Sequence, residues 1–305
     1  MTITHHPEHA VDRAAMASVR SMLGSAKGSI DGPGARQAFD EIMGQVPAAA
    51  GVTYEAAIFG GVSGWWCRPA EVLKGAVILY FHGGGYVVGA SQPYRHFVGQ
   101  VAAHAKAAAF APDYRLAPEH PFPAAVEDAQ AIYQGLVAAG LTNIALAGDS
   151  AGGGLALVLL ASATAKSRAG SAPIPKGAAV MSPWTDLALA GRSMVTRAEA
   201  DPLSTQAQLA AMARLYLAGW DPLDPLASPL YGDLAGLPPV RIHVGEDDVL
   251  LDDSVRYGER FERESGTIQV HSWQGMTHVF PSNIALKAAN EALDDIGDFL
   301  NRRLL

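Results

Sequence analysis

Cysteine and long apolar runs are almost absent from this chain of 305 residues. Its single cysteine, Cys67, excludes an internal disulfide and any metal or redox site of the CxxC type, because each of these needs at least two thiols. The longest apolar run, Leu155 to Ala163, is about half of the ~20 residues that a membrane-spanning helix needs. We therefore expect no association with a membrane.

Positive charge is also scarce. The 22 Lys and Arg residues are outnumbered by 30 Asp and Glu residues, which leaves a net charge of −8. Nucleic-acid binding needs clustered basic side chains, so we exclude a nucleic-acid partner. Residues 1–6 show neither the basic nor the apolar region of a secretory signal, and we expect a cytoplasmic protein. With 49% hydrophobic residues, the chain can bury a large core.

Strand-like and helix-like segments alternate along most of the chain. Two short helices are predicted near 8–23 and 34–44, and an alternating pattern predicts an antiparallel strand pair over 52–59 and 61–68. Short apolar runs bounded by Gly or Pro then indicate strands buried on both faces of a parallel sheet, at 76–81, 107–112, 144–147, 178–181 and 240–244. The helix-like stretches between and after them are 94–106, 124–139, 151–166, 252–264 and 283–302. This order predicts an α/β fold with a mostly parallel central sheet flanked by helices.

One connection is much longer than a crossover requires. Almost sixty residues separate the predicted strands 178–181 and 240–244, and they include an apolar helix over Thr205 to Ala218. We interpret the stretch from about 185 to 225, together with the N-terminal segment 1–45, as a helical cap over one end of the sheet. Residues 46–305 then form the main domain, whose functional loops lie at the carboxyl ends of its strands, beneath this cap.

The strongest chemical signal is the sequence Gly148-Asp149-Ser150-Ala151-Gly152. It follows a predicted strand and opens a helix, which is the setting of a nucleophile elbow. Small residues are needed there because a Cβ at either glycine would collide with the neighbouring strand or helix. Ser150 is therefore the candidate nucleophile. An ordinary Gly-rich helix start or a phosphate-binding turn would show the same short pattern, so the motif needs partners.

Three consecutive glycines follow another predicted strand. In His82-Gly83-Gly84-Gly85 the backbone N–H groups are not obstructed by side chains. Such donors, together with the N–H of Ala151, would stabilise the oxyanion of an acyl-transfer reaction. A flexible loop is the alternative, whereas a dinucleotide-binding turn would need the spacing GxGxxG. We interpret His82 as a brace for the loop.

A carboxylate and a histidine complete the set. Asp248 follows the predicted strand 240–244, and His278 lies thirty residues further on (278 − 248). The order Ser, Asp, His is that of α/β-hydrolases. Asp247 is the alternative to Asp248, and each residue taken alone could be purely structural. Together they predict a catalytic triad of Ser150, His278 and a carboxylate of the run that holds Asp247 and Asp248.

Other residues receive weaker interpretations. Tyr86 and Trp184 follow the glycine loop and a predicted strand, so either could line a substrate pocket, although core packing is an equal alternative. Asp113 and Arg115 are expected to form a structural ion pair. His5, His6 and His9 are interpreted as part of a frayed polar terminus, with metal binding as the alternative.

These motifs resemble those of the hormone-sensitive lipase family of α/β-hydrolases, also called bacterial family IV esterases. The similarity spans roughly residues 50–300, and the serine motif is of the GDSAG and not the GTSAG type. It is carried by His82 to Gly85, Asp113 to Glu119, Gly148 to Gly154, Ser182-Pro183-Trp184, Asp248-Val249-Leu250 and His278. The N-terminal region matches no motif of the family.

The resemblance implies an α/β-hydrolase fold and a serine carboxylesterase that acts on a small-molecule substrate, a short-chain acyl ester, without a metal or organic cofactor. It also favours Asp248 over Asp247, and a homodimer formed through an edge strand. A lactone hydrolase with the same triad is an alternative. An amidase or peptidase, and a non-catalytic ligand-binding protein on the same scaffold, are further alternatives.

Overall fold

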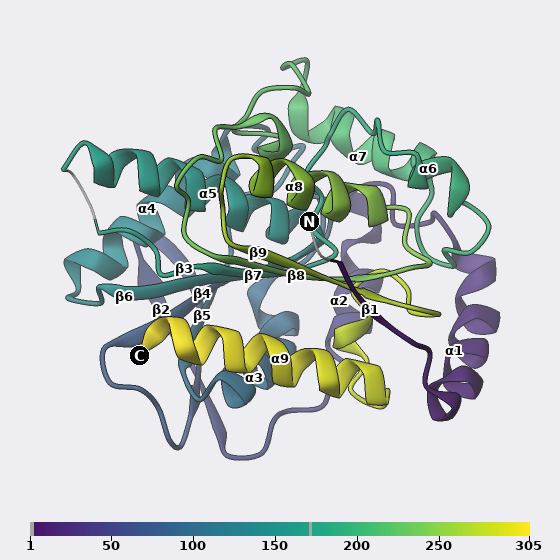
Figure 1. The fold of residues 1–305 in the computed structure, drawn as a ribbon, viewed down its shortest axis with the longest axis horizontal. Coiled ribbons are helices and arrows are strands. Elements are labelled where there is room, and N and C mark those ends of the chain that lie inside the picture. The colour runs from purple at the N-terminus through teal and green to yellow at the C-terminus, as the bar shows by residue number, and fades with distance from the viewer. Residues whose placement is uncertain (1–2, 171–172) are drawn as a thin grey trace.

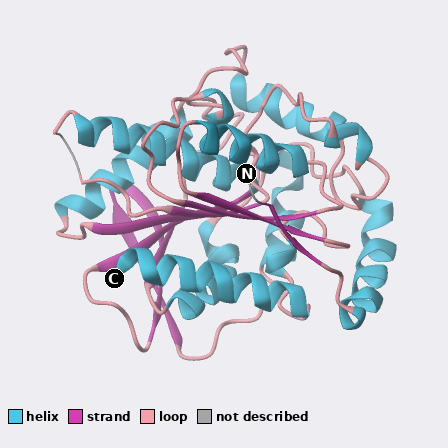
Figure 2. Cartoon of the chain, in the orientation of Figure 1, coloured by secondary structure: helices cyan, strands magenta, loops and turns pink. Residues whose placement is uncertain are grey.

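A nine-stranded sheet with helices on both faces forms the body of the molecule (Figure 1). The computed structural model describes residues 3–170 and 173–305. Met1 and Thr2, which begin the predicted cap segment 1–45, lie outside the described residues. In spatial order the strands are β1-β9-β8-β7-β6-β4-β5-β3-β2. Figure 2 shows them as one twisted layer between helices.

The strands are β1 (Ile3–His6), β2 (Val52–Phe59), β3 (Val62–Pro69), β4 (Ala76–Phe81), β5 (Ala108–Pro112), β6 (Asn143–Asp149), β7 (Ala178–Met181), β8 (Val240–Gly245) and β9 (Ile268–Trp273). The helices are α1 (Ala10–Leu23), α2 (Arg36–Met43), α3 (Ser91–Ala105), α4 (Ala124–Ala138), α5 (Ser150–Arg168), α6 (Ser193–Thr196), α7 (Gln206–Leu217), α8 (Leu251–Arg263) and α9 (Lys287–Leu304). Over residues 3–170 and 173–305, no helix is both long and apolar enough to cross a membrane.

Parallel pairing dominates the sheet, and its central strands are buried on both faces. Every residue of β4, β7 and β8 is buried, as expected for strands covered on both faces. In the described part of the chain, the antiparallel pairs are β2 with β3 and β3 with β5. Helices α4, α5 and α8 cover one face of the sheet, and α3 and α9 cover the other (Figure 1).

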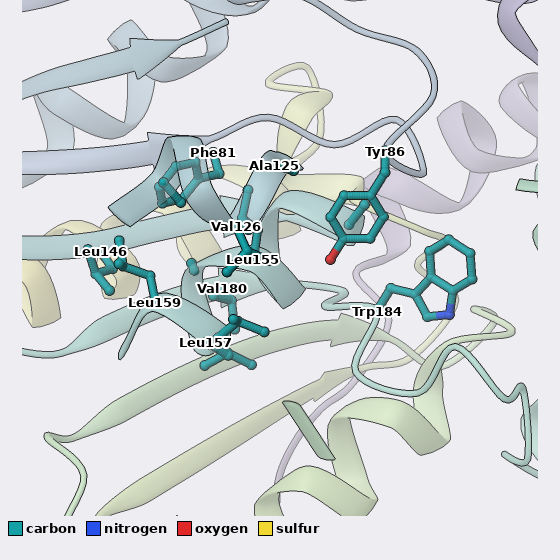
Figure 3. Close-up of a cluster of buried hydrophobic side chains, with 14 of the residues drawn as sticks. Phe81, Tyr86, Ala125, Val126, Leu146, Leu155, Leu157, Leu159, Val180 and Trp184 are labelled. Atoms are coloured by element: carbon teal, nitrogen blue, oxygen red, sulfur yellow. The ribbon is translucent and has the colours of Figure 1, made fainter. Parts of the chain in front are cut away.

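Helix α5 is held on the sheet by its apolar side chains. Figure 3 shows Leu155, Leu157 and Leu159 in one buried cluster with Leu146 and Val180 of the strands below. Complete burial of each such side chain is worth about 1.5–3 kcal/mol. The packing therefore fixes the first turn of α5 at the carboxyl end of β6.

The α/β fold with a mostly parallel sheet is confirmed, and the predicted strands and helices form with bounds that differ by a few residues. The N-terminal stretch is different, because the expectation of a frayed end is wrong. Residues Ile3–His6 form β1, which pairs in parallel with β9. The His6 ring stacks on Trp273 with 3.8 Å between centroids, and its Nε2 lies 2.9 Å from His271 Nδ1. Stacking and pairing supply the order that the local sequence does not reveal.

The two predicted cap segments contact each other. Gly28 N donates a hydrogen bond to Leu203 O (2.9 Å), and Gln208 Nε2 donates to Ile30 O (2.7 Å). Gln208 also forms a capping box with Thr205 at the start of α7, which satisfies backbone donors that a helix start leaves free. The N-terminal segment is thus joined to the long insertion between β7 and β8.

Candidate active site

Ser150 lies at a sharp turn between β6 and α5. Its φ of 52° is in the left-handed region, which a residue other than glycine adopts when the surrounding structure imposes it. A Cβ on Gly152 would lie 2.2 Å from the carbonyl oxygen of Phe81, and a Cβ on Gly148 would lie 2.5 Å from that of Gly152. Both positions therefore need glycine for the strand and the helix to approach this closely.

Three of the predicted side chains, far apart in the sequence, meet at this turn. His278 Nε2 lies 3.0 Å from Ser150 Oγ, and His278 Nδ1 lies 2.9 Å from Asp248 Oδ2. The other Asp248 oxygen accepts the backbone N–H of Leu250 at 2.8 Å. Asp248 is completely buried, whereas Ser150 keeps 8% of its surface exposed. This is the arrangement of an activated hydroxyl: a nucleophile, a base within reach and a carboxylate that orients the base.

Asp247, the alternative to Asp248, has other partners. Its Oδ2 accepts a hydrogen bond from Arg20 Nη2, and its backbone N–H donates to Met276 O. Its carboxylate therefore ties helix α1 to the loop after β8. The structure brings Asp248, and not Asp247, to the imidazole.

The charges around His278 oppose the effect of its burial. Burial lowers the pKa of the imidazole, but the charge and hydrogen bond of Asp248, together with the charges of Asp201 and Asp149, raise this pKa to about 9. The carboxylates thus stabilise the protonated imidazole. This arrangement favours an imidazole that accepts a proton from a neighbouring hydroxyl.

Two of the three glycines of the loop line the same cavity as Ser150. They are Gly84 and Gly85, and no hydrogen bond joins either N–H to another described residue. The Gly83 N–H donates to Asp149 Oδ1 at 3.1 Å, so the expectation that Gly83 belongs to an oxyanion hole is wrong. Ala151 lies in the first turn of α5, where backbone N–H groups lack partners within the helix.

Asp149 anchors the glycine loop. Its buried carboxylate accepts hydrogen bonds from the hydroxyls of Tyr80 (2.7 Å) and Tyr94 (3.1 Å), in addition to the Gly83 N–H. Burial raises the pKa of Asp149 to about 6, although the two hydroxyls lower it. Tyr94 also lines the cavity. Sequence reasoning missed Tyr94, because no local pattern distinguishes it from any other aromatic residue of a buried helix.

His82 supports the same loop from behind. Its Nδ1 lies 2.7 Å from Gly83 O, and its ring stacks on Tyr114 with 4.4 Å between centroids. The Tyr114 hydroxyl donates to His82 O at 2.7 Å. Burial lowers the pKa of His82, which favours the neutral ring. These contacts agree with the predicted role of a brace.

A cavity of about 180 Å³ opens beside Ser150. Its wall comes from the glycine loop, the loop that carries His278, the N-terminal segment and the long insertion. Eight of the lining residues have large apolar side chains: Ile30, Phe39, Ile42, Met43, Leu203, Leu209, Met212 and Val279. Within the described part of the chain, no Lys or Arg lines it. Sequence reasoning did not find these wall residues, because they come from segments that meet only in the folded chain.

Tyr86 and Trp184 lie in the core and not against this cavity. They are 1% and 0% exposed, and neither is among the cavity residues. Tyr86 stacks on Tyr216 with 3.9 Å between centroids, and Trp184 Nε1 donates to Asp186 O. Figure 3 shows both rings at one end of the buried cluster. The expected substrate contact is wrong, and the alternative of core packing holds for both residues.

The expected ion pair between Asp113 and Arg115 is also wrong. Arg115 Nε donates to both oxygens of Asp128 (2.9 and 3.0 Å), and its Nη2 donates to Glu127. Asp113 Oδ1 instead accepts the backbone N–H of Ser91 at 2.7 Å. Arg115 turns toward helix α4 because the start of that helix presents two carboxylates. Both residues still have a structural role.

A second group of titratable side chains lies on the sheet, where β8 and β9 meet α9. His243, His271 and Asp295 have possible ligand atoms within 4.8 Å of one another. Arg241 Nη1 already contacts this group, at 2.6 Å from Asp295 Oδ1 and 3.2 Å from His271 Nε2. A guanidinium therefore takes the place that a metal ion would need, and we assign no metal to this group.

Known proteins share both sequence and structure with this chain. A family model described as the alpha/beta hydrolase fold matches residues 78–282. An acetyl-hydrolase of Streptomyces hygroscopicus is 44% identical over 239 residues, which cover 77% of this chain and 78% of the relative. A solved esterase of the bacterial hormone-sensitive lipase family has a TM-score of 0.87 at 34% identity, covering 95% of this chain and 98% of that one. The esterase EstE5, soaked with p-nitrophenyl butyrate, has a TM-score of 0.85 at 37% identity with the same coverage.

The fold, the site and these similarities define the class, and the chain belongs to the α/β-hydrolase family. Within that family it is a carboxylic ester hydrolase of the bacterial hormone-sensitive lipase type. The resemblance seen in the sequence motifs is thereby confirmed.

Proposed function

We propose that the protein hydrolyses short-chain acyl esters by nucleophilic catalysis, with Ser150, His278 and Asp248 as its triad. One observation carries this proposal: the line of contacts from Ser150 Oγ to His278 Nε2 (3.0 Å) and from His278 Nδ1 to Asp248 (2.9 Å), beside an apolar cavity. Each group has a role in acyl transfer that its position supports.

In the first step His278 Nε2 accepts the hydroxyl proton of Ser150 while Oγ bonds to the ester carbonyl carbon. Asp248 accepts the hydrogen bond of Nδ1–H, which leaves Nε2 free to act as the base and stabilises the imidazolium that forms. The tetrahedral intermediate then breaks its bond to the alkoxy oxygen, and the imidazolium protonates the departing alcohol. Water, deprotonated by the same imidazole, then attacks the acyl carbon. The bond to Ser150 Oγ breaks, the imidazolium returns its proton to Oγ, and the acid leaves.

The oxyanion of each tetrahedral intermediate is assigned to the backbone N–H groups of Gly84, Gly85 and Ala151. Gly83 is left out because its N–H already donates to Asp149. Loss of one such donor typically costs about 2.7–4 kcal/mol of transition-state stabilisation. Little free energy is needed to align these N–H groups during the reaction, because Asp149 and His82 already hold the loop in place.

The cavity supports a short and uncharged acyl or alcohol group. Its volume of about 180 Å³ is small, and its wall is mostly apolar. The similarity to an acetyl-hydrolase, and to an esterase soaked with p-nitrophenyl butyrate, points in the same direction. We therefore assign esters of acids with few carbons, and not long-chain triglycerides, as the substrate class.

The cap, the homodimer and the cytoplasmic location stay predictions. The cap is supported by the hydrogen bonds that join the N-terminal segment to the long insertion, since both line the cavity. For the homodimer, the structure shows which strands at the edges of the sheet could pair with a second copy. Strand β1 covers β9, so the two edges of the sheet are β1 and β2, and a second copy that adds to the sheet would pair with one of them.

Ser150→Ala tests the nucleophile, and Ser282→Ala is its matched control. Ser282 also lines the cavity, but its hydroxyl donates to Val279 O at 2.9 Å. We expect Ser150→Ala to lower kcat for p-nitrophenyl butyrate by about 10⁴-fold or more and to abolish both burst release and fluorophosphonate labelling. Ser282→Ala should keep all three. A burst that survives in Ser150→Ala would overturn the proposed function.

The choice of carboxylate has its own test. Asp248→Asn should lower kcat by about 10²–10⁴-fold, because the imidazole loses the partner that selects its tautomer. Asp247→Asn should change kcat little, since that side chain contacts Arg20 and not His278. Steady-state assays of both variants decide between them, and a larger loss in Asp247→Asn would contradict the assignment.

A further inference from the structure

Asp201 is a buried carboxylate in the long insertion, between α6 and α7, and the reaction described above does not use it. It is completely buried. Its Oδ1 accepts the backbone N–H groups of Leu203 (2.8 Å) and Ser204 (3.0 Å), and its Oδ2 accepts that of Val249 (3.0 Å). Three backbone donors directed at one carboxylate favour its ionised form.

These three bonds join two parts of the site. Leu203 and Ser204 belong to the wall of the cavity, and Val249 directly follows Asp248, which contacts His278. The Asp201 carboxylate is therefore a link between the segment that touches a bound ester and the segment that holds the triad carboxylate. It makes this link with backbone groups, so neither segment can shift without breaking a bond to a buried charge.

A second link connects the loop after β8 to the insertion through Ser193. Ser193 Oγ donates to Val249 O at 2.6 Å and accepts the backbone N–H of Asp252 at 3.0 Å. The Ser193 backbone N–H also donates to Asp252 Oδ2 at 3.1 Å, so this link does not depend on the hydroxyl alone. Because the Ser193 hydroxyl is neutral, Ser193→Ala removes a mechanical contact without a change of charge, whereas Asp201→Asn removes a charge.

The charge of Asp201 also acts on the imidazole. The groups that act electrostatically on His278 are Asp248, which is hydrogen bonded to it, then Asp201 and Asp149, and each raises its pKa against the effect of burial. Burial and the charge of Asp248 raise the pKa of Asp201 above its ordinary value, although its backbone donors and His278 oppose this rise. Asp201 and Asp248 thus form a pair of carboxylates on one side of the imidazole.

We propose that Asp201 is a positioning residue, which fixes the loop carrying Asp248 to the wall of the substrate cavity and adds a second negative charge beside the base. This inference rests on the proposed function, because it concerns the same triad. It assigns to the insertion a part in the acid–base step in addition to shaping the cavity.

The test compares Asp201→Asn, Asp201→Glu and Ser193→Ala. Asp224→Asn is the matched control, because Asp224 Oδ1 accepts a single backbone N–H, that of Leu226, in an exposed turn. For each variant, kcat and KM for p-nitrophenyl acetate are measured across pH, and fluorophosphonate labelling of Ser150 reports the intact nucleophile.

Asp201→Asn should lower the pKa on the acid side of the kcat/KM profile by about one unit, because a charge that favours the imidazolium is removed. Its plateau kcat/KM should fall about tenfold, as expected when a hydrogen bond to a charged group is lost, with both a lower kcat and a higher KM. Ser193→Ala should lower the plateau without moving the pKa. Asp201→Glu should keep the acid-side pKa and lose plateau rate.

Profiles of Asp201→Asn that coincide with those of the wild type and of Asp224→Asn would overturn the inference. If Asp201→Asn does not fold, a plateau in Asp201→Glu equal to that of the wild type would overturn it as well. An inactive wild type whose Ser150 is not labelled would instead refute the proposed function itself, so the two failures are distinguishable.

Discussion

Replacement of Asp149 by alanine is the sharpest test of how the glycine loop is held. The carboxylate accepts three hydrogen bonds, from the Tyr80 hydroxyl, the Tyr94 hydroxyl and the Gly83 N–H, at 2.7, 3.1 and 3.1 Å. All three donors are buried with it. Alanine removes the acceptor and provides nothing in its place.

The size of the effect follows from these three donors. A buried donor left without a partner costs about 1–3 kcal/mol, so three of them cost about 3–9 kcal/mol. Removal of a buried carboxylate recovers part of this, because burial of a charge is itself unfavourable. We expect a net loss of about 3–5 kcal/mol in the free energy of unfolding, which is a fall in Tm of about 6–15 °C for a chain of this size.

Asp149→Asn is the matched variant. Its amide oxygen can accept from Tyr80 and Gly83, and its amide group can donate to the Tyr94 hydroxyl, which serves as donor or acceptor. The three contacts are then kept while the charge is lost. Thermal unfolding and kcat for p-nitrophenyl butyrate should therefore be near those of the wild type in Asp149→Asn, and strongly reduced in Asp149→Ala. The reduction in kcat should be about 10–10³-fold, because the N–H groups of the loop lose their alignment.

The comparison of the two variants refutes or supports the reasoning directly. If Asp149→Ala unfolds at the temperature of Asp149→Asn and keeps its kcat, the carboxylate does not hold the loop. If both variants lose kcat equally at unchanged stability, the charge and not the hydrogen bonds is what matters.

Two further predictions follow from the cavity and from the N-terminal strand. Met212→Ala removes a side chain that lines the cavity and lies against Gly85. The ratio of kcat/KM for a hexanoate ester to that for an acetate ester should therefore rise about tenfold. An unchanged ratio would contradict the assignment of Met212 to the wall of the substrate cavity. Burial lowers the pKa values of His6 and His271 below their ordinary 6.5, and that of His271 falls to about 3. The folded state therefore binds fewer protons than the unfolded state. Its stability is complete above pH 6.5 and is lost as the pH falls below that value. The fall in Tm between pH 7 and pH 5 should be smaller in His6→Phe than in the wild type, because the variant keeps an aromatic ring on Trp273 but has no imidazole to protonate. A fall equal to that of the wild type would argue against the buried place of His6 in the strand.

Much of the fold was predictable because its signals are local. Strands β4 and β7 are continuous apolar runs, and a run of this kind is stable only where both faces of a strand are covered. The elbow was predictable for a similar reason, since Gly148 and Gly152 are required by backbone atoms 2.2–2.5 Å from the position of a Cβ. The capping box that begins α7 is local as well.

Partners of polar side chains were not predictable in the same way. Arg115 pairs with Asp128 and not with Asp113, and Tyr86 packs on Tyr216 away from the cavity. Each partner comes from a different helix, and nothing in the neighbouring sequence shows which helix packs there. Strand β1 was missed for the same reason, because four residues rich in histidine acquire their order from Trp273 and His271.

By itself, the sequence determined the layered α/β fold, the turn that presents Ser150 and the identity of the residues able to act as base and acid. Backbone sterics and the burial of apolar runs decide these features within a few residues. The sequence motifs favoured Asp248, and the tertiary structure shows that it reaches His278. Tertiary structure alone decided which glycine N–H groups stay free and which side chains enclose the cavity. These depend on where strands and helices distant in the chain come to lie, and hydrogen-bond geometry tolerates only a few tenths of an ångström.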